Sequence, residues 1–254
     1  MSGFGAEITP IVTTRDEAAN IERSLRGLTW AREVIVVDNF SEDETVRIAS
    51  SFPNVRVIQR PFDDLATQWT FATAQAKSEW VLTLDADYIV PDTLAHEIDA
   101  LAPNEDVSGY ETSFTYVSRG RPLRGSLYPP RAVLLRRGRY EFVMDGHTQR
   151  VNVHGAVQSL QHRVMHDDRK PMRRFIARQR RYMGDEAKKL RATSFGALPL
   201  SGKIRKLRVI APFAVAIQTL FVKGLILDGW PGIYYALERF IAECILTREL
   251  FRAQ

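Results

Sequence analysis

The sequence predicts an α/β domain built on a mainly parallel sheet covered by helices, with a helical extension at its C-terminal end. Up to residue 101, short apolar runs alternate with segments whose apolar residues recur at helical spacing. The runs are continuous and rich in β-branched residues, which is typical of strands buried on both faces. Near the end of the chain, two apolar segments flank a strong turn signal, DGWPG at residues 228–232.

The first part of the chain reads as regular strand–helix alternation, the pattern of a parallel sheet. Ser41 and Glu44 predict a capping box before the second helix. Pro91 lies where a proline is tolerated, near the first turn of the fourth helix. We expect strands at residues 8–12, 33–38, 55–59 and 80–84, and helices at residues 18–28, 46–49, 65–76 and 91–101.

The pattern changes after residue 110, and we divide the chain into residues 1–110, 111–192 and 193–254. The middle part begins with mixed strands and ends in a basic segment. The last part follows a linker at residues 194–202. We expect strands at 110–117 and 132–136, a short mixed stretch at 151–161, a long basic helix at 171–190, and apolar helices at 204–227 and 232–251.

The composition bounds the class of protein. A chain of 254 residues, 45% hydrophobic and 26% charged, fits one α/β domain with an appendage or two small domains. These values exclude wholesale disorder and collagen-like repeats. The one cysteine, Cys244, excludes an internal disulfide framework and a multi-cysteine zinc site. Residues 1–7 have neither the basic start nor the apolar run of a signal peptide, so we expect a cytoplasmic location.

The net charge of +5 conceals a strong asymmetry along the chain. Residues 1–110 hold 19 acidic and 8 basic side chains, a net charge of −11. Residues 163–208 hold 4 acidic and 15 basic side chains, a net charge of +11. An acidic half followed by a basic stretch indicates a polyanionic partner, such as nucleic acid, phospholipid or a phosphorylated substrate.

The apolar C-terminal segments allow two interpretations. The uncharged run at residues 209–222 contains Pro212 and ends at Lys223, so it is shorter than the roughly 18–20 residues that a membrane span needs. In one interpretation the segments form a helical hairpin that packs on the main domain or on a second subunit of an oligomer. In the other they lie in the interface of an anionic membrane, on the inner face of the cytoplasmic membrane, beside the basic stretch.

Acidic side chains follow several of the expected strands. The second strand ends at Asp38, and the fourth ends at Asp85-Ala86-Asp87. In an open parallel sheet, ligands bind beyond the carboxyl ends of the strands. Two carboxylates at i and i+2 repel each other, and a divalent cation relieves that repulsion. Hard oxygen ligands favour Mg²⁺ or Mn²⁺, which keep coordination positions open for phosphate oxygens, so we expect a metal-bound diphosphate here.

Competing nucleotide motifs are missing from the sequence. It contains neither GxGxxG nor GxxxxGK[ST], and no GxSxG elbow. A dehydrogenase, a P-loop enzyme or an α/β-hydrolase is therefore poorly supported.

Several segments carry a family resemblance. ITPIVTTRDEAANIERSL, EVIVVDNFSEDET and WVLTLDADYIVP resemble the family 2 glycosyltransferases with a GT-A (nucleotide-diphospho-sugar transferase) fold. Within that family, these segments and MDGHTQRV, HDDRKP, QRRYMGDEA and LILDGWPG are similar to the branch of bacterial lipopolysaccharide core glucosyltransferases. The resemblance implies an inverting transfer of a sugar from a nucleotide diphosphate, a UDP-sugar, to a hydroxyl of a cell-envelope glycolipid or polysaccharide.

The resemblance also implies roles for individual residues. Residues 1–110 would be the nucleotide-sugar-binding half, with Asp87 as main metal ligand and Asp85 nearer the ribose and the sugar. Arg60 would lie near the base, although Arg60-Pro61-Phe62-Asp63 stands where the family usually has Asn-x-Gly. The remaining nucleotide contacts would be Thr13, Thr14 and Glu17 in the nucleoside pocket and Asp38 at the uracil or ribose.

Residues 111–192 would form the acceptor side, with the basic helix. An inverting transfer needs a general base to deprotonate the acceptor hydroxyl, and Asp145 matches the family's position best. Glu141 and His147 are the reserves. His166 would be a further metal ligand, oriented by Asp168. His147, Arg169 and Arg173 are candidate contacts to phosphate or acceptor.

Two rival hypotheses stay open at this point. A nucleic-acid-binding protein would use the basic stretch at residues 163–208, but this leaves the strand-end acids unexplained, and no RNA-recognition, KH or zinc-finger signature is present. An inactive GT-A-like subunit would serve only for interaction. The intact DAD motif argues against it.

Overall fold

The computed structural model describes residues 3–145 and 148–252, and the chain divides into two compact units. The first unit comprises Met1–Thr115, Tyr128–Met144 and Gln149–Arg169. The second comprises Tyr116–Leu127, Asp145–Thr148 and Lys170–Gln254. Each unit is described by itself below.

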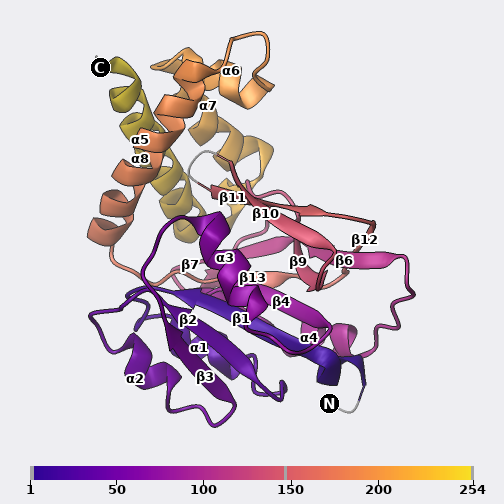
Figure 1. Ribbon diagram of the computed structural model, residues 1–254. Helices are drawn as coiled ribbons and strands as arrows, with labels where there is room; N and C mark the ends of the chain where they lie inside the picture. Colours follow the sequence, from indigo (N-terminus) through magenta and orange to yellow (C-terminus); the bar gives the residue numbers. More distant parts are fainter. Residues whose placement is uncertain (1–2, 146–147, 253–254) are drawn as a thin grey trace. The chain divides into compact units, whose positions relative to one another are not determined.

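The first unit is built on a seven-stranded sheet in the order β12-β6-β9-β4-β1-β2-β3 (Figure 1). Strands β4, β1, β2 and β3 are parallel, as the strand–helix alternation predicts. Strand β9 runs antiparallel between β4 and β6, and β12 is parallel to β6. The strands are β1 (Ile8–Thr14), β2 (Val34–Asp38), β3 (Val55–Gln59), β4 (Trp80–Asp85), β6 (Val107–Thr112), β9 (Arg131–Arg136) and β12 (Ala156–Ser159).

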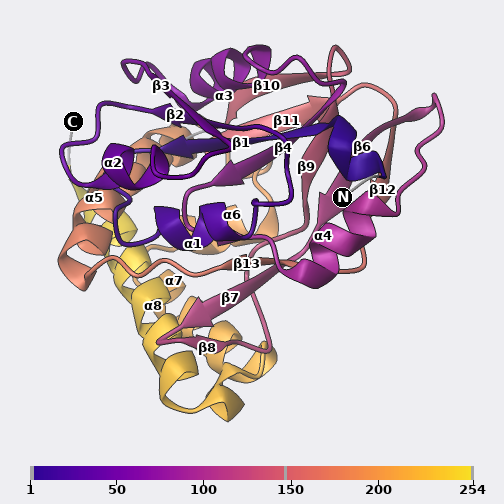
Figure 2. The same cartoon turned by 90° about the horizontal axis from the view of Figure 1, so that it is seen from below.

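Helices cover both faces of this sheet. Figure 2 shows α3 on one side of the strands and α1 and α4 on the other. The β-branched strands alternate between the two faces: in β2, Val34 and Val36 pack with α1 and α4, whereas Ile35 and Val37 pack with α3. The helices are α1 (Ile21–Arg26), α2 (Thr45–Ala49), α3 (Leu65–Ala74) and α4 (Asp92–Asp99), with a 3₁₀ turn, η1 (Phe4–Glu7), before β1.

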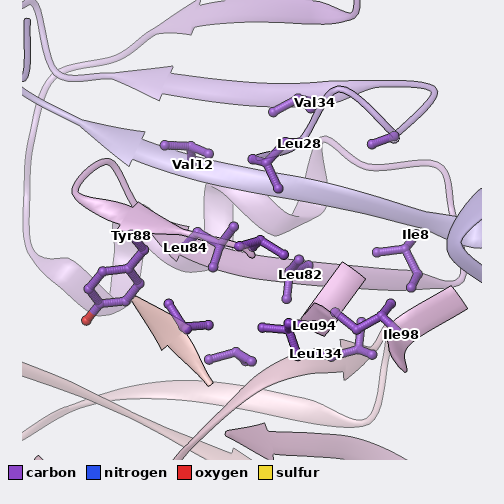
Figure 3. Close-up of a cluster of buried hydrophobic side chains, with 14 of the residues drawn as sticks. Ile8, Val12, Leu28, Val34, Leu82, Leu84, Tyr88, Leu94, Ile98 and Leu134 are labelled. Carbon is purple, nitrogen blue, oxygen red and sulfur yellow. The ribbon is translucent and has the colours of Figure 1, made fainter. Parts of the chain in front are cut away.

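The larger buried cluster holds the carboxyl ends of β1 and β4 in place. It includes Val12 and Leu84, both fully buried near the ends of their strands, together with Tyr88 (Figure 3). Side chains from α4, Leu94 and Ile98, complete it below the sheet. Because these residues are inaccessible to water, the polar residues that follow each strand start from a rigid base.

Two smaller sheets accompany the main one. One has the order β5-β13-β7-β8 and the other pairs β10 with β11. The predicted single strand at 110–117 is wrong: β6 and β7 belong to different sheets, because the chain leaves the main sheet at Ser113. These strands are β5 (Tyr88–Ile89), β7 (Phe114–Ser118), β8 (Arg121–Pro122), β10 (Tyr140–Asp145), β11 (Thr148–Val153) and β13 (Val164–His166).

The second unit is mainly helical, as the sequence predicts for the C-terminal extension. Its long helices α5 and α8 pack through a small apolar core that includes Met183, Leu190 and Leu246. Beside it, the guanidinium of Arg205 donates to the buried carboxylate of Glu243 at 2.7 Å. The helices are α5 (Met172–Ala192), α6 (Leu200–Lys206), α7 (Ile210–Ile217), a π turn η2 (Gln218–Val222), a 3₁₀ turn η3 (Leu225–Asp228) and α8 (Trp230–Phe251).

The predicted continuous helix at residues 204–227 is wrong. The chain adopts left-handed backbone angles at Arg208 (φ 53°) and at Gly224 (φ 71°), and each interrupts the helical path. Pro212 lies within the first turn of α7, where a missing N–H costs no hydrogen bond. Within the described part of the chain, no helix is both long and apolar enough to cross a membrane.

Candidate active site

The carboxyl ends of the four parallel strands meet at one edge of the main sheet. Thr13 of β1 is the register partner of Asp85 on β4, and Thr14 is the partner of Asp38 on β2. Asp38 is in turn level with Gln59, the last residue of β3. The acids that the sequence places after separate strands therefore lie on the two strands that flank β1, at the same edge of the sheet.

The turn after β4 carries the two acids of the DAD motif. Asp85 ends β4, Ala86 is buried in the core, and Asp87 is 8% exposed just before β5. Burial, followed by the charge of Asp87, raises the pKa of the Asp85 carboxyl. Burial also raises the pKa of Tyr88 well above its ordinary value, and the charge of Asp85 adds to this effect. The turn thus concentrates negative charge in a region with little water to screen it.

Strand β13 brings His166, which is 79 residues from Asp87 in the sequence, to this turn. His166 is the antiparallel register partner of Tyr88, and its Nε2 lies 3.1 Å from Oδ2 of Asp87. The rings of Tyr88 and Tyr128 lie around the imidazole, with centroids 5.1 and 6.3 Å away. Burial alone would lower the pKa of His166, but the charge of Asp87 and the hydrogen bond to it outweigh this effect and raise it.

The donor set at this turn fits a divalent cation that shares its coordination with a ligand. Asp87 and His166 offer a carboxylate oxygen and an imidazole nitrogen in contact with each other. Over the described residues, no group of three or more His, Cys, Asp or Glu side chains is arranged to hold a metal by itself. Mg²⁺ and Mn²⁺ commonly bind through one or two protein carboxylates and take their other ligands from water and phosphate.

Asn20 and Arg23 of the α1 region hold the segment that follows His166. Arg23 donates to the buried carboxylate of Asp167 and, at 3.1 Å, to its carbonyl oxygen. The Asn20 amide donates to Glu17 Oε2 at 2.7 Å and to Asp168 Oδ1 at 3.2 Å. The side-chain oxygen of Asn20, Oδ1, accepts a hydrogen bond from the backbone N–H of Arg169 at 3.0 Å. One buried amide therefore links the loop after β1 to the segment after β13.

The loops after β1 and β2 are tied together by Ser41. Its hydroxyl donates to Oδ1 of Asp38 and accepts the backbone N–H of Asp16 at 2.9 Å. The predicted capping box is therefore wrong: Ser41 serves the strand end, and Glu44 is the N-cap residue of α2. The fully buried Asp38 carboxylate also accepts from Gln59 at 3.0 Å, so it stabilises the junction of β2 and β3.

Arg60 follows β3 and extends this network. Its guanidinium donates to Gln68 Oε1 at 3.2 Å and lies 4.8 Å from the centroid of the Phe71 ring. Gln68 donates to the side chain of Asn39, the residue after Asp38, at 2.7 Å. Helix α3 thereby fixes the positions of Arg60 and Asn39 at the strand ends.

Three residues at the site were missed by the sequence analysis. They are Arg131, Tyr128 and Asn20. Arg131, at the start of β9, lies 4.8 Å from the ring of Tyr128, and its charge acts to lower the pKa of Asp85. Each is a single polar or aromatic residue in a loop or at the end of an element, and no sequence spacing distinguishes it. Only the tertiary fold places these residues near the DAD turn.

Sequence comparison identifies the family to which the chain belongs. The model of glycosyl transferase family 2 matches residues 9–160, more than half of the chain.

The chain belongs to glycosyl transferase family 2.

Curated relatives agree with this assignment. An uncharacterized glycosyltransferase of Rickettsia bellii is 35% identical over 105 residues, which make up 41% of this chain and 35% of that protein. The lipopolysaccharide core biosynthesis glycosyltransferase LpsC of Rhizobium meliloti is 25% identical over 154 residues, 55% of each protein. The family 2 chain thus spans about a third of the length of the Rickettsia relative and about half that of LpsC.

A solved structure confirms the predicted GT-A fold. The mannosyltransferase PcManGT of Pyrobaculum calidifontis, determined in complex with GDP-Man and Mn²⁺, matches with a TM-score of 0.53 and 20% sequence identity. The match covers 96% of the family 2 chain and 87% of PcManGT. At this identity the likeness concerns the fold.

The candidate residues for the acceptor side do not belong to the group of strand-end residues described above. Asp145 and Arg173 belong to the second unit, whereas the strand-end carboxylates belong to the first. Within the second unit, Lys189 of α5 donates to Oδ1 of Asp145, and both side chains are 41% exposed. The reserve Glu141 accepts from Asn152 at 2.9 Å. The other reserve, His147, lies outside the described residues.

Proposed function

We propose that this protein is an inverting, metal-dependent glycosyltransferase that moves a sugar from a UDP-sugar to a hydroxyl of a cell-envelope glycolipid or polysaccharide. The observation that carries the proposal is the meeting of Asp85, Asp87 and His166 at the carboxyl edge of the parallel sheet. Family membership supports glycosyl transfer over nucleic-acid binding.

The donor diphosphate is proposed to bind beyond the DAD turn. Asp87 and His166 would hold a divalent cation, Mn²⁺ or Mg²⁺, which when bound neutralises the charge of the departing diphosphate. The Mn²⁺ in the PcManGT complex supports the use of a divalent cation by this chain. Arg131 carries a positive charge that acts on Asp85, and it is suited to bind a phosphate oxygen.

The nucleoside is proposed to lie over the ends of β1, β2 and β3. Thr13, Thr14 and Glu17 would line its pocket, and Arg60, held by Gln68, would lie near the base. Asp38 is the proposed contact to uracil or ribose. Its carboxylate already accepts hydrogen bonds from Ser41 and Gln59, so we assign it the further task of fixing the two loops that frame the nucleoside.

The transfer itself needs a base on the acceptor side. In our proposal, the acceptor oxygen attacks the anomeric carbon, the bond from this carbon to the diphosphate oxygen breaks, and Asp145 takes the hydroxyl proton. Lys189, which donates to Asp145, would hold the carboxylate in a defined orientation. Arg169 and Arg173 are proposed contacts to phosphate or acceptor.

The acceptor class comes from the relative of known role. LpsC is named for lipopolysaccharide core biosynthesis, which supports a glycolipid or polysaccharide acceptor for this chain. Such an acceptor agrees with the proposed location in the cytoplasm, at the inner face of the cytoplasmic membrane. Alternatively, the C-terminal helices would join copies of the chain into an oligomer instead of contacting the membrane.

A thermal-shift screen tests the proposed function. UDP- and GDP-sugars are added singly, each with Mn²⁺, with Mg²⁺ and with a chelator, and hits are then assayed for release of nucleoside diphosphate. We expect a rise in Tm with a UDP-sugar only when a divalent metal is present, because ligand binding stabilises the folded state. If a GDP-sugar alone gives the shift, the uridine assignment is wrong; if no nucleotide sugar does, the proposed function is wrong.

A further inference from the structure

The second unit exposes a large number of apolar side chains on its C-terminal helices. They gather on α7, η2, η3 and the first half of α8, and several are more than half exposed, including Phe221 at 61% and Trp230 at 63%. An exposed apolar patch of this extent marks an interaction site in a folded protein. The members of this apolar surface are Val209, Ile210, Phe213, Ile217, Phe221, Val222, Ile226, Leu227, Trp230, Ile233 and Leu237.

Two helical stripes make up most of the apolar surface. Ile210, Phe213, Ile217 and Phe221 follow each other at intervals of three or four residues, so they lie along one side of the helical path of α7 and η2. On α8, Trp230, Ile233, Leu237 and Phe240 repeat at the same intervals. The rings of Phe213 and Phe240 meet edge to face, with centroids 5.5 Å apart, which joins the two stripes.

Positive charge surrounds the apolar surface. Between residues 199 and 237 the sequence has five basic residues and one acidic residue, Asp228, and of the five only Arg205 pairs with the buried Glu243. Arg124 neutralises that acid, because its backbone N–H and its Nε both donate to the Asp228 carboxylate, at 3.1 and 2.8 Å. Lys223, at the turn between η2 and η3, and Arg208, before α7, are both exposed.

The loop around β8 adds further cations at the same turn. Arg119 places its guanidinium 4.0 Å from the centroid of the Tyr234 ring on α8. Gly125 approaches the backbone of Lys223 so closely that an added Cβ would lie 2.6 Å from the Lys223 carbonyl oxygen. These contacts fix Arg119 and Arg124 beside η3 and the start of α8, and Arg121 lies between them in sequence, exposed on β8.

We infer that the apolar surface is a docking site for an anionic lipid bilayer, into whose interface the two helical stripes insert while the surrounding cations bind lipid phosphates. The helices lie on the membrane and do not cross it, which agrees with their broken path and their length. Trp230, at the start of α8, belongs to the residue type that favours the boundary between headgroups and acyl chains.

Charge decides between a membrane and a second copy of the chain as the occupant. A symmetric dimer through this surface would bring two cationic rims together, and like charges there repel. A bilayer rich in anionic lipid attracts the same rim, because each Lys or Arg near its surface strengthens binding. The inference goes beyond the proposed function, since membrane binding does not require glycosyl transfer.

Vesicle sedimentation without any sugar nucleotide tests the inference, and its result is independent of the transfer assay. We expect the protein to pellet with vesicles of phosphatidylcholine and phosphatidylglycerol in equal parts, and to do so less at high salt. Vesicles of phosphatidylcholine alone should bind at least about tenfold more weakly. Binding should shift the fluorescence of Trp230 to shorter wavelength, and a Trp230→Phe variant should lose most of this shift.

Matched variants locate the binding surface. Ile217→Glu with Phe221→Glu changes two residues that are 57% and 61% exposed, so the fold should persist, and we expect binding to fall at least about tenfold. Val157→Glu, on the exposed edge strand β12 of the first unit, is the control and should bind normally. Lys223→Gln with Arg121→Gln should weaken binding about tenfold or more, whereas Lys77→Gln should not.

Each alternative outcome overturns the inference. Equal binding by all variants would mean that another surface meets the membrane. A monomer that fails to pellet with anionic vesicles would exclude lipid as the occupant. Concentration-dependent dimers in sedimentation velocity, abolished by the Ile217→Glu and Phe221→Glu changes in a protein that ignores vesicles, would assign the surface to self-association.

Discussion

The imidazole of His166 contacts the carboxylate of Asp87, with 3.1 Å between Nε2 and Oδ2. The two residues are far apart in sequence, and the antiparallel pairing of β13 with β5 brings them together. Since both atoms are good ligands for a divalent cation, the contact marks where the proposed metal would bind the protein.

His166→Phe tests the second ligand of this proposed metal site. Phenylalanine suits the surrounding rings of Tyr88 and Tyr128, so the fold should persist. We expect the affinity for Mn²⁺ in the presence of nucleoside diphosphate to fall by at least about tenfold, as measured by calorimetric titration. The control, His154→Phe, changes an exposed histidine and should leave the affinity unchanged. Unchanged affinity in His166→Phe would remove this residue from the metal site.

Asp145→Asn tests the proposed base. Asparagine keeps the size of the side chain but cannot take a proton at neutral pH, so we expect donor binding to persist and transfer to fall by at least about a hundredfold. Donor binding is followed by thermal shift and transfer by release of nucleoside diphosphate with acceptor present. Glu141→Gln is the matched control. If Asp145→Asn transfers at the normal rate while Glu141→Gln is inactive, the reserve residue is the base.

Asn20→Ala tests the link between the loop after β1 and the segment after β13. The buried amide donates to Glu17 and Asp168 and accepts from Arg169, so its removal breaks these three hydrogen bonds. We expect the free energy of unfolding to fall by about 1–3 kcal/mol in urea denaturation. Thr29→Ala, which removes an exposed side-chain hydrogen bond, should cost much less. Equal losses in the two variants would contradict the role assigned to Asn20.

Glu97 gives the first unit a predictable dependence on pH. Burial acts to raise the pKa of this carboxyl, but N–H donors from Gln161 and His162 outweigh it and lower the pKa below the ordinary value of 4.5. A lowered folded-state pKa means that the stabilisation is complete above the unfolded-state pKa and is lost as the pH falls through the folded-state pKa.

Urea denaturation of the wild type and of Glu97→Gln measures this effect. We expect the variant to be less stable by about 1–2 kcal/mol at pH 7, and the difference to shrink once the pH falls below 4.5. A difference that is constant across this range would show that the Glu97 charge does not contribute.

The sequence was sufficient to predict the sheet edge because each acid there follows an apolar run. A run such as WVLTL within regular strand–helix alternation is typical of a buried strand, and parallel strands align their carboxyl ends, so Asp38 and Asp85 were expected at one edge. His166 was different. Strands β5 and β13 are only two and three residues long, too short for a periodic pattern, and only family resemblance pointed to this residue.

Other features depend on contacts that sequence spacing does not encode. Ser41 has the spacing of a capping residue, yet its hydroxyl donates to Asp38, and α2 begins only at Thr45 with Glu44 as its N-cap. The break at Arg208 has no glycine or proline to announce it, whereas Gly224 does announce the next one. Asn20 and Arg131 are isolated in sequence and gain their roles only from tertiary packing.

The metal dependence of donor turnover in Asp87→Asn tests the central claim most directly. Nucleoside diphosphate release is measured for the wild type and the variant across a Mn²⁺ titration, with circular dichroism to verify folding. Removing one of two neighbouring buried charges relieves repulsion, so the variant should fold normally. We expect the wild type to release nucleoside diphosphate only with Mn²⁺. In the folded variant, the rate of this release should fall by at least about a hundredfold. Metal-dependent release at the wild-type rate in Asp87→Asn would contradict the account.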